Sequence, residues 1–193
     1  MWEQILPGLR IKLFMTLVLG VVYPLAMTGI SQALFHRQAN GSLIKVGDKV
    51  IGSDLIGQLF TKPQYFLPRP SAAGKDGYDA TASGGSNYGP TNQQLIDRVK
   101  ASVDQFRKDN PDYQGPIPAD LVTTSASGLD PHLSPDSAKA QSPRVAKARG
   151  ATVDQMQRLI AQFTEGPDLG FLGEPRVNVL RLNLALDQQF PRK

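Results

Sequence analysis

Side chains of the types used in hydrolytic catalysis occur between Ser125 and His132. Ser125 and Ser127 are possible nucleophiles, and Asp130 and His132 could act as the orienting acid and the base. Neither serine has a glycine two residues before and after it, as a nucleophile elbow requires. Residues this close in sequence also rarely supply a whole triad. We therefore interpret His132 as a turn residue after Pro131 and predict no catalytic residue.

Metal and phosphate sites have little support. The chain has no cysteine, and its two histidines, His36 and His132, are too far apart for zinc-ligand spacing. The glycine-rich segment Ser83–Gly89 could offer a nest of N–H groups to an anion, but no Walker lysine follows it. A tight turn with positive φ at glycine is the simpler interpretation. We predict no metal ligand, and no cofactor-binding residue can be assigned.

The charge pattern argues against nucleic-acid binding. The 193 residues include 21 Lys and Arg against 17 Asp and Glu, giving a net charge of +4. These charges are spread along the chain, whereas a nucleic-acid interface needs a clustered basic face. The frequent glycine and proline, 18 and 15 residues, predict many turns.

The elements that hold these residues begin with an uncharged stretch of 23 residues, from Leu13 to Phe35. As a helix it would rise roughly 35 Å, and a bilayer's hydrocarbon core is about 30 Å thick. Basic residues close both ends of the stretch: Arg10, Lys12, His36 and Arg37. We predict a transmembrane helix, and a signal peptide cleaved near Ser31–Ala33 is the alternative.

Three residues inside this stretch indicate where the helix would kink and where it would contact other helices. Pro24 removes one backbone N–H and should kink the helix. Gly20 and Gly29 are small and would let other helices approach closely. We predict that these three residues, Gly20, Pro24 and Gly29, form the packing region of the span.

The chain therefore divides into a short cytoplasmic tail (1–12), a transmembrane helix (13–35) and an extracytoplasmic domain (36–193). The orientation follows from the basic residues beside the short tail, since long domains translocate largely regardless of charge. The expected fold is a single transmembrane α-helix plus one compact α+β extracytoplasmic domain.

Local patterns predict the elements of that domain. A Gly47-Asp48 pair between two β-rich runs predicts a hairpin with a type II′ turn, and Leu55–Phe60 could be a strand or one helical turn. Further along, the patterns predict a helix from 93 to about 108, a strand over 121–124, short helices from 134 and over 144–149, a helix with a capping box from 152, a strand over 176–179 and a helix over 180–189.

Residues 61–92 show no periodicity and predict a long loop. Segments of this length are either disordered or functional, and disordered segments are poor in aromatics. Tyr65, Phe66, Tyr78 and Tyr88 therefore indicate that the loop docks onto something. Without a catalytic constellation, the residues favour a membrane-anchored accessory subunit. A membrane-tethered exported enzyme or solute-binding protein is the alternative.

Seven stretches, in order along nearly the whole chain, resemble one known family, the small C subunit of the bacterial Kdp potassium-transporting P-type ATPase. They are Ala39–Ile44 (ANGSLI), Gly52–Ser53 with Leu55–Gln58 (GS and LIGQ), Arg69–Ala72 (RPSA), Ala82–Asn87 (ASGGSN), Ser125–His132 (SASGLDPH), Pro143–Arg149 (PRVAKAR), and Val177–Leu180 with Leu182–Asp187 (VNVL and LNLALD).

The resemblance implies a single-span subunit of the bacterial inner membrane, which joins a channel-like potassium subunit, an ATP-hydrolysing subunit and a small single-helix subunit. It implies high-affinity, ATP-driven potassium import, with this chain as a catalytic chaperone that raises the ATP affinity of the hydrolysing subunit. ATP and potassium would be handled by the complex, and the family motifs supply no catalytic residue.

Two loops are our predicted contacts with the potassium subunit under that resemblance. One contains Arg69 and Pro70, and the other contains Ser83, Gly84, Gly85, Ser86 and Asn87. A loop that packs only on its own domain is an equally good interpretation of both.

Overall fold

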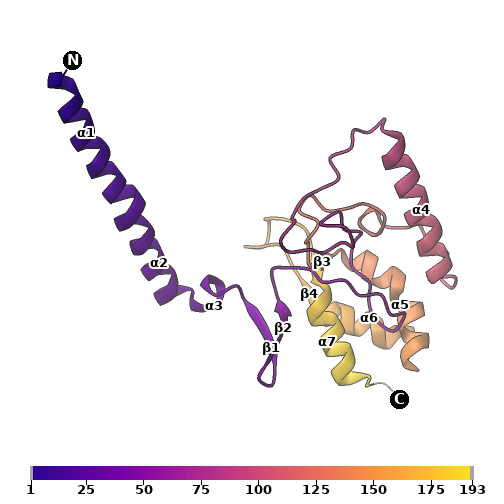
Figure 1. The fold of residues 1–193 in the computed structure, drawn as a ribbon. Coiled ribbons are helices and arrows are strands. Elements are labelled where there is room, and N and C mark those ends of the chain that lie inside the picture. The colour runs from indigo at the N-terminus through magenta and orange to yellow at the C-terminus, as the bar shows by residue number, and fades with distance from the viewer. Residues whose placement is uncertain (1, 192–193) are drawn as a thin grey trace. The chain divides into compact units, whose positions relative to one another are not determined.

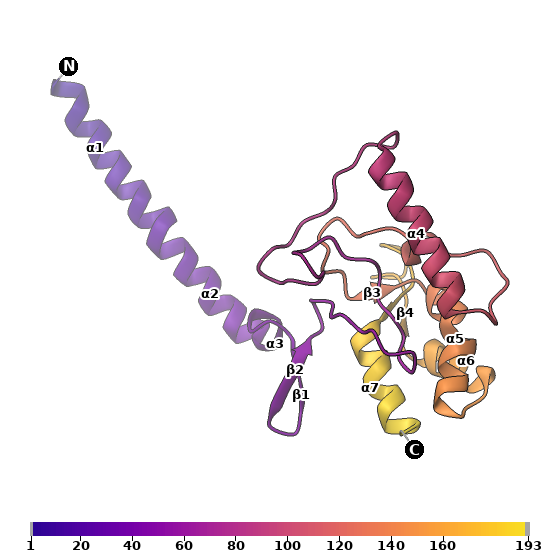
Figure 2. The same cartoon turned by 45° about the vertical axis from the view of Figure 1, so that its right-hand side comes forward.

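A computed structural model describes residues 2–191 (Figures 1 and 2). The chain divides into two compact units, one ending at Ile44 and the other beginning at Lys45. Each is described by itself.

The first unit is dominated by one long helix. It comprises α1 (Trp2–Leu17), a π-helical turn (Val18–Val22) and α2 (Tyr23–Leu34), followed by the short α3 (His36–Ala39). From Glu3 to Leu34 this helix is long and apolar enough to cross a membrane, and no part of its apolar window is buried. The predicted membrane-capable helix is therefore confirmed, with a longer helix than the apolar stretch alone.

Proline changes the helix differently from our prediction. Pro24 lies in the first turn of α2, and the N–H of Tyr23 donates to the carbonyl of Val18, five residues back. A π-helical turn accommodates the missing N–H and the bulk of the proline ring by widening the helix. The ribbon continues through this region without a sharp bend (Figure 1), so the expected kink is absent and a π-helical turn is present instead.

A hairpin begins the chain's β structure. Strands β1 (Leu43–Val46) and β2 (Lys49–Ser53) form a two-stranded sheet. Gly47 has φ +60°, which the first central position of a type II′ turn requires. The predicted hairpin is confirmed. Residues 55–60 form no helix or strand, so neither element expected there is present.

The second unit has a small sheet at its centre. Strands β3 (His132–Leu133), β5 (Arg176–Asn178) and β4 (Thr164–Glu165) pair antiparallel in the order β3-β5-β4. His132 pairs with Asn178, and Thr164 pairs with Val177. His132 is thus a strand residue and not the turn residue that we predicted. The small antiparallel sheet with its helices confirms the α+β class.

Helices α5 (Pro135–Arg149) and α7 (Val179–Gln189) contact strand β5, and α6 (Val153–Gln162) packs against both of these helices (Figures 1 and 2). Their shared core contains Leu133, Val145, Met156, Ile160, Val177, Leu182 and Leu186. The predicted capping box is formed, with Thr152 and Gln155 each bonded to the other's backbone N–H. The predicted strand at 176 and the helix that follows it are also confirmed.

Two predictions in this unit were wrong. The two short helices expected around Pro143 are one continuous α5, in which proline is an interior residue. The strand expected over 121–124 is absent. A 3-10 turn spans Ala119–Leu121 instead. The predicted helix from 93 is present as α4 (Gln93–Asp109); of the two residues that could cap it, Thr91 and Asn92, Asn92 does so, since its side chain accepts from the N–H of Gln94.

The long loop was predicted correctly and is docked. Residues 54–92 contain no helix or strand, yet Phe66 is fully buried. The amide of Asn183 in α7 bonds both the N–H and the carbonyl of Phe66 at 2.9 Å. The amide of Gln141 in α5 does the same for Leu67, at 2.8 and 3.0 Å. The two side-chain amides thus satisfy the backbone N–H and carbonyl groups of this segment, as a neighbouring strand would in a sheet.

Candidate functional site

The predicted interface loops lie against a third loop, residues 124–131. The N–H of Gly84 and the hydroxyl of Ser83 both donate to the carbonyl of Ser127, at 2.9 and 3.0 Å. The hydroxyls of Ser86 and Thr124 are 3.5 Å apart. The structure therefore brings Ser83–Asn87 together with the serines considered above as nucleophiles.

Close backbone approach, and not positive φ, explains the glycine at position 85 of this loop. A Cβ on Gly85 would lie 2.9 Å from the carbonyl oxygen of Ala126. Asn87 has the left-handed conformation, with φ +49°, whereas Gly84 and Gly85 do not. Our prediction of positive φ at these glycines was wrong: Gly85 is used for its small size, and a Cβ on Gly84 would meet nothing within 4 Å.

A charged cluster joins the other predicted loop to residue 130. Arg69 donates to one carboxylate oxygen of Asp130 at 2.9 Å. The other oxygen accepts from the backbone N–H of His132 at 3.0 Å and lies 3.5 Å from its Nδ1. Burial raises the pKa of Asp130, but the hydrogen bonds from His132 and the charge of Arg69 outweigh burial and hold that pKa below its usual range.

Neighbouring polar groups complete the link between the loops. The hydroxyl of Tyr78 donates to the carbonyl of Arg69 at 2.8 Å, and burial raises the pKa of this phenol. The hydroxyl of Ser71 donates to the carbonyl of Gly128 at 2.6 Å. Ser127, the other candidate nucleophile, accepts from the N–H of Leu129 at 3.1 Å. These contacts hold loops together, and none aligns a serine hydroxyl with the imidazole.

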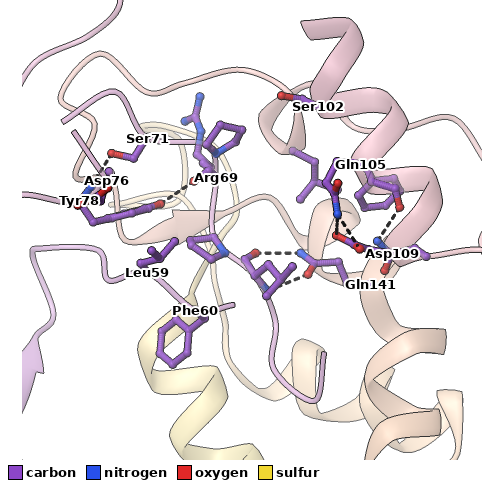
Figure 3. A pocket seen from close by; sticks show the side chains of 17 residues that line it. Leu59, Phe60, Arg69, Ser71, Asp76, Tyr78, Ser102, Gln105, Asp109 and Gln141 are labelled. Carbon is purple, nitrogen blue, oxygen red and sulfur yellow. Dashed lines mark hydrogen bonds between the residues drawn. The ribbon is translucent and has the colours of Figure 1, made fainter. Parts of the chain in front are cut away.

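Two cavities adjoin these loops. One has a volume of about 260 Å³ (Figure 3). Leu59, Phe60 and Tyr78 of the long loop line one side of it, and Gln105 and Asp109 of α4 line the other. Its amides are already engaged, because Gln105 bonds Asp109 and Gln141 bonds the backbone of Leu67. The other cavity, of about 580 Å³, is an open groove between Leu55 and Ile56 on one side and 125–131 on the other.

Within residues 2–191, no group of three potential metal ligands occurs.

Sequence reasoning missed a buried cationic cluster. Arg144 in α5 is bonded to Asn110, Tyr65, Gln141 and, by a short contact, Pro63. Arg149 bonds Gln64, Asp187 and Phe190 and lies over the ring of Tyr65. Both arginines lie on the same helix as several buried alanines, which could have indicated that they are buried too. Sequence reasoning did not assign them to the core because charged residues are rarely buried.

The predicted packing residues of the long helix are accessible. A Cβ on Gly29 would meet nothing within 4 Å, and one on Gly20 would meet only the Thr16 side chain, at 3.9 Å. The hydroxyl of Thr28 donates to the carbonyl of Pro24 at 2.8 Å.

Comparison with known proteins decides the family. The family model described as "KdpC: K+-transporting ATPase, c chain" matches residues 5–188. The chain belongs to the KdpC family. The match includes the apolar helix and both predicted interface loops, and it confirms the resemblance found in the sequence.

Several curated KdpC proteins are similar over nearly their whole length. Each has the name Potassium-transporting ATPase KdpC subunit. The protein of Myxococcus xanthus is 53% identical over 98% of this chain and 90% of its own length. Those of Rhodospirillum rubrum and Nitratidesulfovibrio vulgaris are 54% and 55% identical, over 99% and 93% of this chain and 98% and 91% of their own lengths.

Proposed function

We propose that this KdpC-family chain is a non-catalytic accessory subunit of an ATP-driven, high-affinity potassium import complex in the bacterial inner membrane. The observation that supports it most directly is the family match from residue 5 to 188, since relatives of the same length are named subunits of a potassium-transporting ATPase. Its partners would be the channel-like potassium subunit, the ATP-hydrolysing subunit and the small single-helix subunit.

The proposed placement is a single pass with residues 36–193 outside the cytoplasm. The apolar helix Glu3–Leu34 supports the pass. The basic residues Arg10 and Lys12 beside the short tail support the orientation.

We propose that any effect on ATP affinity is indirect. ATP is cytoplasmic, and the proposed topology leaves only the short tail on that side. The glycine-rich loop is also engaged within its own domain, because the N–H of Gly84 already donates to Ser127. The chain would raise the ATP affinity of the hydrolysing subunit by bracing the complex through its helix and by orienting the potassium entrance with its domain.

The loops at Arg69–Pro70 and Ser83–Asn87 remain our proposed contacts with the potassium subunit. Gly85→Val is a poor probe of this contact, because its Cβ would meet Ala126 within the chain. Ser83 is exposed and is better suited. Ser83→Arg adds bulk toward a partner and should lower co-purification of the potassium subunit, whereas Ser83→Ala loses only the bond to Ser127 and should not.

Affinity purification tests the function as a whole. The full chain, tagged at its C-terminus and expressed with its neighbouring genes, is extracted in mild detergent, and the proteins that accompany it are identified by mass spectrometry. We expect the ATP-hydrolysing and potassium-binding subunits. A chain that purifies alone from membranes in which those subunits are present would contradict the proposal and favour a tethered enzyme or binding protein.

A further inference from the structure

The connection between β4 and β5 presents three large apolar side chains to solvent. Leu169 is 83% exposed, Phe171 75% and Leu172 51%. They lie within eight residues, Pro167–Glu174, which we call the apolar tip. Soluble surfaces rarely gather this much apolar area in one place, and such patches mark interaction sites.

The apolar tip is held in one conformation. Asp168 and Leu172 exchange backbone hydrogen bonds of 2.8 and 2.9 Å, which close a tight turn. Within it Leu169 has φ +54°, a left-handed conformation that branched side chains disfavour. Arg176 of β5 bonds the carboxylate of Asp168 at 3.2 Å and ties the turn to the sheet. The apolar groups are therefore presented by a fixed turn, which reduces the entropy lost on binding.

The charges around the apolar tip are mainly negative. Glu165, Asp168 and Glu174 lie in or beside it, and two cations, Arg176 and Arg181, lie among them. The Asp168 side chain is 69% exposed, and that of Glu165 is 42% exposed. Arg176 contacts both Glu165 and Asp168, and Arg181 also contacts Glu165. The three carboxylates outnumber the two arginines by one, and this acidic rim favours a partner that is basic around its apolar surface.

We propose that the apolar tip inserts into an apolar pocket rimmed by Lys or Arg on another subunit of the same membrane complex. This proposal rests on the function proposed above. A lipid surface fits less well, because segments that bind anionic bilayers carry Lys and Arg beside their apolar residues. A second copy of this chain fits less well too, because a two-fold contact would bring two acidic rims together.

Crosslinking from the apolar tip identifies its neighbour directly. Phe171 is replaced by p-benzoylphenylalanine in the full chain, expressed with its complex, and native membranes are irradiated. We expect one adduct, with a subunit that also co-purifies with the unmodified chain, and with Lys or Arg in the crosslinked peptide. An adduct with lipid or with a second copy, or no adduct, would overturn the proposal.

A double variant measures what the contact contributes. Leu169→Ser with Phe171→Ser should weaken retention of that subunit by roughly tenfold or more, because two anchoring side chains are lost. The thermal unfolding midpoint should hardly change, since both side chains are exposed in the isolated chain. Val46→Ser, at a residue of β1 that is 54% exposed and lines neither cavity described above, is the matched control.

The outcomes separate the two proposals. If the unmodified chain retains no ATPase subunit, the proposed function fails. If the unmodified chain retains the subunits and the double variant retains them equally well, the function stands and the role of the apolar tip is refuted.

Discussion

At the scale of residues, the domain depends on one buried arginine, Arg144, that binds neutral groups in its interior. Arg144 is 8% exposed, and its guanidinium donates to the side chains of Asn110 and Gln141 and to the carbonyls of Pro63 and Tyr65. Burial lowers its pKa to about 10, and the charge of Asp109 partly offsets this. Arg144 remains protonated at neutral pH and cross-links the long loop to α5.

Arg144→Met tests this cross-link. The substitution keeps an unbranched side chain but leaves several buried acceptors without donors, so we expect the free energy of unfolding to fall by about 3 kcal/mol. Denaturant unfolding followed by circular dichroism measures it. Arg158→Met, at an exposed position of α6, should change it by less than about 0.5 kcal/mol. Equal effects of the two substitutions would contradict the assigned role.

Asp130 makes the stability of the domain depend on pH. Its pKa in the folded chain lies below the usual value of 3.8. The native state therefore binds this proton less readily than the unfolded state. The resulting stabilisation is present above the unfolded pKa and is lost as the pH falls through the folded pKa.

Asp130→Asn should therefore flatten the acid side of the stability profile. We expect the unfolding midpoint of the unsubstituted protein to fall more steeply between pH 6 and pH 2 than that of the variant, by about the contribution of one titrating group. Asp104→Asn removes an exposed carboxylate from α4 and controls for net charge. Parallel profiles for the unsubstituted protein and Asp130→Asn would show that the ionised carboxylate of Asp130 does not stabilise the fold.

At the scale of elements, the long helix has surfaces that only other helices could cover. The side chains from Leu13 to Leu34 are almost all exposed, and Gly29 has open space around it. Within a membrane, close approach at small residues and not the hydrophobic effect drives helix association.

Gly29→Leu is a clean probe of that association. Because a side chain at this position would meet nothing in its own chain, a loss of retained subunits would report a partner helix. We expect co-purification to fall several-fold while the variant still partitions into membranes. Gly8→Leu, where a Cβ likewise meets nothing within 4 Å, is the control outside the predicted apolar stretch. Undiminished retention would remove Gly29 from the packing region.

At the scale of the whole molecule, the proposed topology places the domain outside the cytoplasm and can be tested by labelling. The chain has no cysteine, so a single introduced cysteine is a unique label. Gln4 precedes the apolar stretch, and Gln188 lies on α7; both are exposed.

Labelling with a membrane-impermeant maleimide tests the proposed topology. In intact spheroplasts we expect Gln188→Cys to react before lysis and Gln4→Cys to react only after it, because the bilayer shields the cytoplasmic tail. The opposite pattern would reverse the orientation. A labelled domain that no longer sediments with membranes would instead support cleavage near Ser31–Ala33.

The sequence by itself determined what depends on near neighbours. Caps such as Asn92 and Thr152, the Gly47 turn and the apolar stretch of the long helix act within a few residues or by simple length, so their patterns are visible in the sequence. The family was visible as well, since its motifs occur in order along the chain.

Only the tertiary structure decided which polar residues are buried and which apolar ones are not. Pro143 could remain inside α5 because that helix is held by core contacts on both sides of it. Arg144 and Gln141 became interior residues because a loop more than 70 residues away supplies their partners. Leu169 and Phe171 stayed outside because a turn closed by Asp168 and Leu172 directs them away from the core. Each outcome depends on long-range contacts, which local periodicity does not encode.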